Sequence, residues 1–219
     1  MKNISVNVGR PRLIPWKGQI YSTGIFKDPV AGRVMLRKTN LDGDRQADLS
    51  AHGGPDKAVY GYPSEHYPFW SNVLSGKDLR WGSFGENLTT EGMFETDISV
   101  GDQFRVGSAV VMARSPRIPC LKLAAKFDRD TMIKEFLSSG YSGFYFSVVE
   151  EGEIGAGDQF QFLGGETPRL SIFDVNRLYI SPASDLELLE RATQVKSLPA
   201  GWREHFEAKL AAAMKQATI

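Results

Sequence analysis

The sequence predicts a mainly β domain with a few helices over residues 1–163, followed by a small three-helix domain over residues 164–219. Up to about residue 163, short apolar runs alternate with Gly, Pro and Asp, which is the pattern of strands joined by turns. Beyond the Gly- and Pro-containing segment 164–168, apolar residues recur at helical spacing instead. A length of 219 residues suits one main domain with a small appendage.

Six segments of the first domain are expected to form strands. They are residues 4–8, 18–27, 32–36, 58–62, 108–113 and 144–149. Two helical stretches interrupt them. Residues 63–74 have Ser64 as an N-cap, and residues 121–137 hold one or two helices broken near Asp128. Asp130 is placed to cap the second of these helices, and Gly140 to end it.

A short repeat indicates two similar corners of one β-barrel. Residues 100–104, Val-Gly-Asp-Gln-Phe, recur at 156–160 as Ala-Gly-Asp-Gln-Phe. In each copy the Gly-Asp pair predicts a tight turn, and an apolar strand follows. We therefore interpret the repeat as structural and not as a ligand-binding motif.

Three helices are expected beyond the linker at residues 164–168. The first covers residues 169–180, and the second opens with Pro-Ala-Ser-Asp at 182–185. The third follows Leu-Pro at 198–199 and carries Trp202, Phe206 and Leu210 at four-residue spacing. Helices this short are not stable alone in water, so we expect them to bury a shared apolar seam, together or against the first domain.

Charge and cysteine content limit the functional classes. Lys and Arg number 26, as do Asp and Glu, so the chain lacks the basic excess of a protein that binds nucleic acid polymers or a membrane surface. One cysteine cannot form an intrachain disulfide, which suits a reducing compartment. No apolar run approaches the roughly 20 residues of a membrane helix. We therefore expect a cytoplasmic protein.

The strongest chemical signal is Ser-Pro-Arg-Ile-Pro-Cys at residues 115–120. Because Pro119 keeps the preceding residue out of helical geometry, Cys120 is expected in the first turn of a helix. Free N–H groups and the helix dipole favour a thiolate there. Such a thiolate can serve as a nucleophile, a redox centre or a soft metal ligand. The alternative is a small buried apolar residue, the commonest role of a lone cysteine.

Two further segments carry ligand-binding residue types. In His52-Gly53-Gly54-Pro55-Asp56-Lys57, the glycines allow a backbone to approach an anion, and Lys57 is placed to meet a phosphate. The alternative is a plain glycine turn. In Phe84-Gly85-Glu86-Asn87-Leu88, Asn87 can donate and accept hydrogen bonds, and Glu86 is a further candidate contact. Here the alternative is a turn with Asn87 in the left-handed conformation. His66 and His205 are expected to pack or to lie on the surface.

These three segments, with Lys27-Asp28-Pro29-Val30 and Gly101-Asp102, resemble the MOSC superfamily, named for the C-terminal domain of molybdenum cofactor sulfurases. The chain looks most similar to the bacterial YiiM-like branch, in which a three-helix "3-alpha" domain follows the MOSC domain. The resemblance implies a β-barrel-like MOSC fold that binds the molybdenum cofactor, a molybdopterin.

The resemblance also implies roles for individual residues. Cys120 would ligate molybdenum or carry sulfur as a persulfide. The candidates for the phosphate and pterin shell are Arg117, Lys57, His52, Gly53, Asn87, Glu86 and Ser115. Related sequences commonly have Gln where Ser115 stands, which leaves the role of that position open.

In related enzymes the metal centre reduces N-hydroxylated compounds, including N-hydroxylated nucleobases, so a reductase of such small molecules is the first hypothesis. The second is a carrier that holds the cofactor or a Cys120 persulfide without turnover, and the third is an interaction module with an inert cysteine. The sequence shows no Gly-x-Gly-x-x-Gly fingerprint and no iron–sulfur cysteine set. Electrons would therefore come from a separate reductase. We expect no nucleic acid polymer or membrane as partner, and a homodimer is left open.

Overall fold

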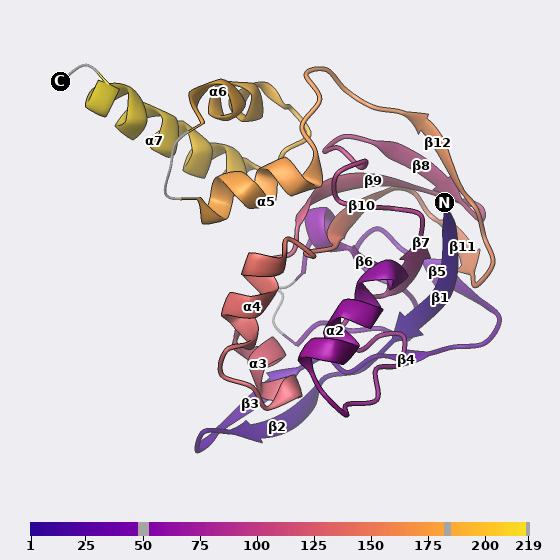
Figure 1. Ribbon diagram of the computed structural model, residues 1–219. Helices are drawn as coiled ribbons and strands as arrows, with labels where there is room; N and C mark the ends of the chain where they lie inside the picture. Colours follow the sequence, from indigo (N-terminus) through magenta and orange to yellow (C-terminus); the bar gives the residue numbers. More distant parts are fainter. Residues whose placement is uncertain (48–52, 182–184, 218–219) are drawn as a thin grey trace.

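The computed structural model describes residues 1–47, 53–181 and 185–217. A curved sheet occupies one side of the molecule in Figure 1, and the last three helices gather beside one end of it. The strands are β1 (Lys2–Val8), β2 (Arg12–Trp16), β3 (Gln19–Thr23), β4 (Asp28–Pro29), β5 (Arg33–Leu36), β6 (Val59–Pro63), β7 (Leu88–Glu91), β8 (Gln103–Val106), β9 (Ala109–Pro116), β10 (Phe144–Glu150), β11 (Gly152–Gly155) and β12 (Phe160–Gly164). The 3₁₀-helices are η1 (Pro55–Lys57) and η2 (Ser64–His66), and the α-helices are α2 (Tyr67–Val73), α3 (Leu121–Phe127), α4 (Met132–Ser139), α5 (Ile172–Ile180), α6 (Leu186–Gln194) and α7 (Ala200–Ala217).

An eight-stranded sheet forms the frame, in the order β12-β8-β9-β10-β6-β7-β1-β4. Its pairings are antiparallel except that between β6 and β7. The sheet-dominated fold is as expected, but the sheet is not a closed barrel. The free edge of β1 pairs with β4 at Asn7 and Val8, and near Lys2 an isolated bridge to Gln159 with a few hydrogen bonds around it ties β1 to the chain before β12, without forming a ladder of the named strands. A closed barrel requires a continuous ladder along that edge.

The Gly-Asp repeat forms two tight turns, as the sequence predicts. Gly101 and Gly157 adopt φ values of 87° and 96°, which L-residues with a side chain rarely adopt. The strands that follow, β8 and β12, pair with each other, with Phe104 opposite Phe162. The repeat therefore builds two neighbouring strands of one sheet.

The expected break between two helices lies at Asp128, whose φ of 48° ends α3, and Gly140 ends α4 in the same left-handed region. Two expected caps are wrong. Ser64 lies inside η2, and its hydroxyl bonds Glu65 next to it, at 3.2 Å. Thr131, not Asp130, precedes α4. Asp130 instead pairs with Lys17 at 2.6 Å, so its carboxylate points away from the helix start.

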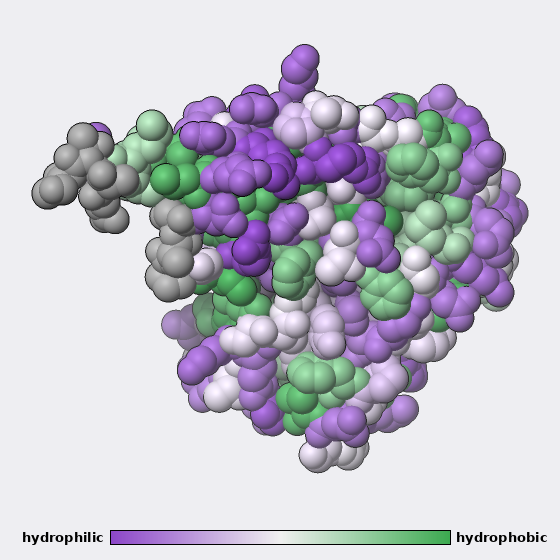
Figure 2. All heavy atoms as spheres, turned by 45° about the horizontal axis from the view of Figure 1, so that its top comes forward, coloured by the Kyte–Doolittle hydropathy of each residue, from purple (hydrophilic) through white to green (hydrophobic). Residues whose placement is uncertain are grey.

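The C-terminal helices share the hydrophobic core of the sheet. Leu170, Leu188 and Phe206 belong to the same buried cluster as Val100 and Phe104. α5 contacts β9, and α6 packs on α7. The surface in Figure 2 is largely hydrophilic, with its apolar residues in separate patches. The helices therefore bury the apolar seam that their sequence predicts, and they bury it against the sheet. The boundary at residues 163 and 164 remains a prediction.

Candidate functional site

A pocket opens where the chain leaves β9 and turns into α3. Its void is about 640 Å³ with the open mouth included. Within the described residues, Lys57, Asn87, Arg117 and Cys120 all line it. These four side chains come from the three segments that the sequence singles out, so the fold brings together what the chain keeps far apart.

The one thiol of the chain, that of Cys120, is half-buried and lies in the wall of this pocket. Its backbone is extended, with φ −130° and ψ 176°, and it forms the N-cap of α3. Its carbonyl accepts a hydrogen bond from the Leu123 N–H at 2.9 Å. Cys120 thus lies one residue before the helical turn in which we expected it. A half-buried thiol in the wall of a pocket that five cationic residues line does not fit the alternative of a small apolar core residue.

Arg117 is held rigidly at the same pocket. It is 6% exposed, and its guanidinium lies 4.9 Å from the ring centroid of Tyr60 and 5.7 Å from that of Phe136. It also donates a hydrogen bond to the Phe84 carbonyl. Contacts with two aromatic faces and one carbonyl fix the group, and its positive charge stays at the pocket wall.

The charged side chains that line the pocket are cationic, although one of them, Lys27, is paired with Asp44 behind the wall. Five cationic residues line it: Lys27, Arg45, Lys57, Arg117 and Lys122. Among the described lining residues there is no Asp or Glu. Tyr60 and Tyr145 add aromatic surface, and burial raises the pKa of both phenols, so both stay neutral at ordinary pH. Such a pocket is complementary to an anion with a flat ring system.

Asn87 joins the pocket wall to a buried ion pair. Its side-chain oxygen accepts a bond from the Tyr60 N–H at 3.2 Å, and its amide nitrogen donates to Asp44 Oδ2 at 2.9 Å. Asp44 Oδ1 lies 2.5 Å from Lys27 Nζ. Asn87 is absent from the residues with positive φ, so the left-handed turn is excluded. Its amide is largely used within the protein, and it supports the pocket wall more than it is available to a ligand.

The comparisons with known proteins place the chain in a family. Residues 48–161, more than half of the chain, match the MOSC domain, and residues 170–213 match the YiiM-like, 3-alpha helix domain. The chain belongs to the MOSC domain family. The C-terminal match falls on α5, α6 and α7, which agrees with the expected three-helix domain.

Several relatives resemble this MOSC protein along much of its length. It is 43% identical to the uncharacterized protein YflK of Bacillus subtilis over 206 residues, which are 94% of this chain and 93% of YflK. It is 38% identical to protein YiiM of Escherichia coli over 146 residues, 64% of this chain and 65% of YiiM. A protein of Gibberella moniliformis named "Reductase" is 32% identical over 88% of this chain, which corresponds to 34% of that protein. The crystal structure of YiiM from Geobacillus stearothermophilus superposes with a TM-score of 0.79 at 33% identity, covering 95% of this chain and 98% of that one.

Glu86 does not line the pocket of this MOSC domain. It is fully buried and accepts hydrogen bonds from the Gly82 N–H at 2.7 Å, the Phe84 N–H at 3.0 Å and the Thr89 hydroxyl at 3.0 Å. The Tyr67 hydroxyl donates to it as well. Burial raises the pKa of this carboxyl group. Glu86 therefore organises the turn before β7, and the structure gives no support to a ligand contact.

Of the other expected residues that the structure describes, two lie outside the pocket lining. Ser115 is 1% exposed and sits in β9 opposite Tyr145. Gly53 lines a neighbouring pocket, which it shares with Lys57. His52 lies outside the described residues. Ser115 is covered because β9 pairs with β10 at this position, a tertiary contact that the sequence does not show.

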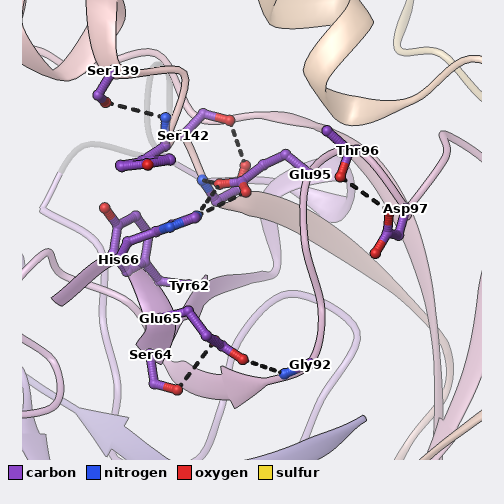
Figure 3. A network of polar contacts seen from close by, with 12 residues as sticks. Tyr62, Ser64, Glu65, His66, Gly92, Glu95, Thr96, Asp97, Ser139 and Ser142 are labelled. Atoms are coloured by element: carbon purple, nitrogen blue, oxygen red, sulfur yellow. Dashed lines mark hydrogen bonds and ion pairs between the residues drawn. The ribbon is translucent and has the colours of Figure 1, made fainter. Parts of the chain in front are cut away.

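His66 packs as expected, in a buried polar cluster away from the pocket (Figure 3). Its ring stacks on Tyr141 with centroids 3.9 Å apart, and its Nε2 lies 2.8 Å from Glu95 Oε2. The other carboxylate oxygen of Glu95 accepts the Gly143 N–H at 2.7 Å. The pair ties η2 to the loop before β10 and presents no group to the candidate site.

MOSC domains are associated with binding of the molybdenum cofactor, and the residues present fit that group. Within the described residues, no group of three or more His, Cys, Asp or Glu side chains is placed to hold a metal ion. The pocket offers one soft sulfur ligand and many positive charges. That donor set suits a metal that arrives with its own sulfur ligands on an anionic, phosphate-bearing organic group.

Several residues that line this site were not assigned to it from the sequence. Lys27 was noted only within the resemblance, and Arg45 and Tyr145 were not singled out. Lys27 and Asp44 carry no signal as a pair, because β4 and β5 lie between them in the sequence and the two meet only when the chain folds back. Tyr145 did have a signal in the sequence. It lies between the apolar Phe144 and Phe146 in a strand, so alternation predicts that its side chain points to the other face of the sheet from theirs.

Proposed function

We propose that this MOSC protein binds the molybdenum cofactor in the basic pocket, with the Cys120 sulfur as the ligand to the metal, and reduces N-hydroxylated small molecules. The observation that carries the proposal is the meeting of one half-buried thiol with five cationic residues and no described carboxylate in one pocket. The relative named "Reductase" supports the class of reaction.

The overall reaction cleaves an N–O bond. Two electrons and two protons convert R–NH–OH into R–NH₂ and water. When bound, the cofactor supplies the redox chemistry, and the protein supplies ligand, position and surroundings. Within the described part of the chain no second thiol is available to store electrons, so a separate reductase would deliver them.

The side chains of the pocket have distinct tasks in this proposal. Cys120 holds the metal through its sulfur. Lys57 and Arg117 bind the anionic portion of the cofactor, and Arg117 is already fixed by its aromatic neighbours. Tyr60 and Tyr145 line the wall with aromatic surface, and the Tyr60 hydroxyl is held by the hydrogen bond that it donates to the Ser142 carbonyl at 2.8 Å.

The competing proposal is a carrier of cofactor or of a Cys120 persulfide. One observation favours it: the described pocket lining contains no carboxylic acid that would donate protons to a leaving hydroxyl group. The experiment that separates the two uses protein loaded with cofactor, an artificial electron donor and 6-hydroxylaminopurine. We expect adenine as product. Loaded protein that forms no adenine, and that shows persulfide on Cys120 by mass spectrometry, would establish the carrier instead.

A further inference from the structure

A second pocket lies between the loop that carries Lys57 and the C-terminal helices. Its void is about 920 Å³ with open solvent included. Gly53, Pro55, Asp56 and Lys57 form one side, and residues of α5 and α7 form the other. Lys57 also lines the pocket that contains Cys120, so this residue belongs to the walls of both pockets.

Three rings form the helical wall of this second pocket. Tyr179 contacts Trp202 edge-on, with centroids 5.3 Å apart, and lies 5.7 Å from the ring of His205. Tyr179 is 40% exposed, Trp202 is half-buried and His205 is exposed. We call Tyr179, Trp202 and His205 the aromatic wall. Large rings that remain accessible beside a cavity provide stacking surface for a planar ligand.

The aromatic wall is held in place by the core beneath it. Trp202 packs 5.8 Å from the buried ring of Phe206 and against the main hydrophobic cluster. Its ring is therefore positioned before any ligand arrives, which lowers the entropic cost of binding. Across the pocket, Asp56 pairs with Arg114 at 2.8 Å, so its carboxylate is neutralised and does not repel an electron-rich ring.

We propose that the aromatic wall binds the planar nitrogen heterocycle of a substrate, so that the C-terminal helices select the substrate class. The ring stacks on the face of Trp202 and meets Tyr179, which stands at 66° to that face, edge to face, and Lys57 and His205 supply polar groups for its edge nitrogens. The inference rests on the proposed function in one respect: the same ligand would present its N-hydroxyl group to the Cys120 pocket beyond Lys57. It assigns to the 3-alpha region a direct contact with substrate.

Two variants of the full chain test this inference by separate means. Trp202→Leu removes the stacking surface. Gly201→Leu adds a side chain to the same pocket, and a Cβ at Gly201 meets no atom within 4 Å, so the helix accommodates it. The matched control is Trp81→Leu, because Trp81 is 37% exposed and lines a different pocket. Thermal unfolding verifies that each variant folds, and Gly201→Leu decides the matter if Trp202→Leu does not fold.

The first readout is the dissociation constant of 6-hydroxylaminopurine from equilibrium dialysis, which requires no turnover. We expect it to rise about tenfold or more in Trp202→Leu and in Gly201→Leu, the range typical of lost base–aromatic stacking, and to stay unchanged in Trp81→Leu. An unchanged dissociation constant in every folded variant of the second pocket would overturn the inference.

The second readout is reduction by cofactor-loaded protein of 6-hydroxylaminopurine and of hydroxylamine, which has no ring. We expect KM to rise for the purine alone, and an equal rise for both compounds would count against the inference. If purine binding weakens in the variants although neither compound is reduced, the aromatic wall stands and the proposed reductase function fails. If both compounds are reduced and purine binding is unchanged in the variants, the proposed reductase function stands and the aromatic wall fails.

Discussion

The Lys27 ammonium lies 2.5 Å from the Asp44 carboxylate, and the side chains are 7% and 0% exposed. The second oxygen of Asp44 accepts the bond from Asn87, so one carboxylate fixes two residues of the pocket wall. Burial lowers the pKa of Lys27, and Asp44 opposes that shift. The pocket therefore depends on a charge pair that is almost entirely removed from water.

Replacing Asp44 by Asn should destabilise the protein strongly. The substitution leaves the Lys27 charge buried and unpaired, and breaking a buried pair typically costs about 3–5 kcal/mol. The free energy of unfolding from urea titration measures the effect. The control is Asp42→Asn, which breaks the exposed pair with Arg37 at 3.0 Å and should change stability little. Equal effects of the two substitutions would show that Asp44 has no special role.

Lys126 should make stability depend on pH. Its ammonium donates to the carbonyls of Ile25 at 3.0 Å and Gly82 at 3.1 Å, and burial lowers its pKa to about 7. Between about pH 7 and the ordinary lysine pKa, the unfolded chain holds a proton that the folded chain has lost. Stability should therefore rise with pH in this window, by at most about 1.4 kcal/mol per pH unit.

The variant Lys126→Met tests this linkage. Urea unfolding at several values between pH 7 and pH 9 should show a shallower rise for the variant than for the natural protein. Comparing slopes removes the contribution of other groups that titrate in both. Parallel slopes would mean that Lys126 keeps its proton in the folded state throughout this range.

Glu86 should act on stability and not on the cofactor. In Glu86→Gln one carboxylate oxygen becomes an amide that cannot accept the Phe84 N–H or the Gly82 N–H. Each buried group left unsatisfied costs about 1–3 kcal/mol. We expect a lower midpoint of urea unfolding, with molybdenum per folded molecule unchanged. Loss of molybdenum from a Glu86→Gln variant that remains fully folded would instead support Glu86 as a contact to the cofactor.

Lys57 should bind the cofactor through charge. In Lys57→Gln we expect cofactor retention to weaken about tenfold or more, because a hydrogen bond to a charged group contributes about 1.5–3 kcal/mol. The exposed Lys77 provides the control Lys77→Gln. Pterin released on denaturation, measured by fluorescence per mole of protein, distinguishes the two. Similar pterin content in both variants would remove Lys57 from the proposed site.

The strand pattern and the turns of the Gly-Asp repeat could be predicted from the sequence because they depend on neighbouring residues. Alternation and turn residues are properties of neighbouring positions, so β1, β5 and β10 were predicted near their observed bounds. The exposed β2 strand was missed, because Pro15 lies within it and its outward residue Leu13 is 70% exposed. An apolar residue that faces solvent gives the opposite of the usual signal.

Part of the candidate site could be predicted from the sequence for a related reason. Cys120 and Lys57 were found because their neighbours, prolines and glycines, constrain the backbone. Glu86 and Asn87 are adjacent in sequence, yet one supports a turn and the other reaches the pocket wall. That difference depends on Asp44 and Tyr60, which approach only through the tertiary fold. Whether the sheet closes into a barrel likewise depends on which strand pairs with the free edge of β1, and that pairing is a tertiary contact.

The most direct test of the central claim is the molybdenum content of the protein purified from a host that makes the cofactor, compared with that of Cys120→Ala. We predict close to one molybdenum per chain in the natural protein, and none above background in the folded variant. Molybdenum and pterin at the same level in both proteins would contradict the claim that the Cys120 sulfur holds the metal.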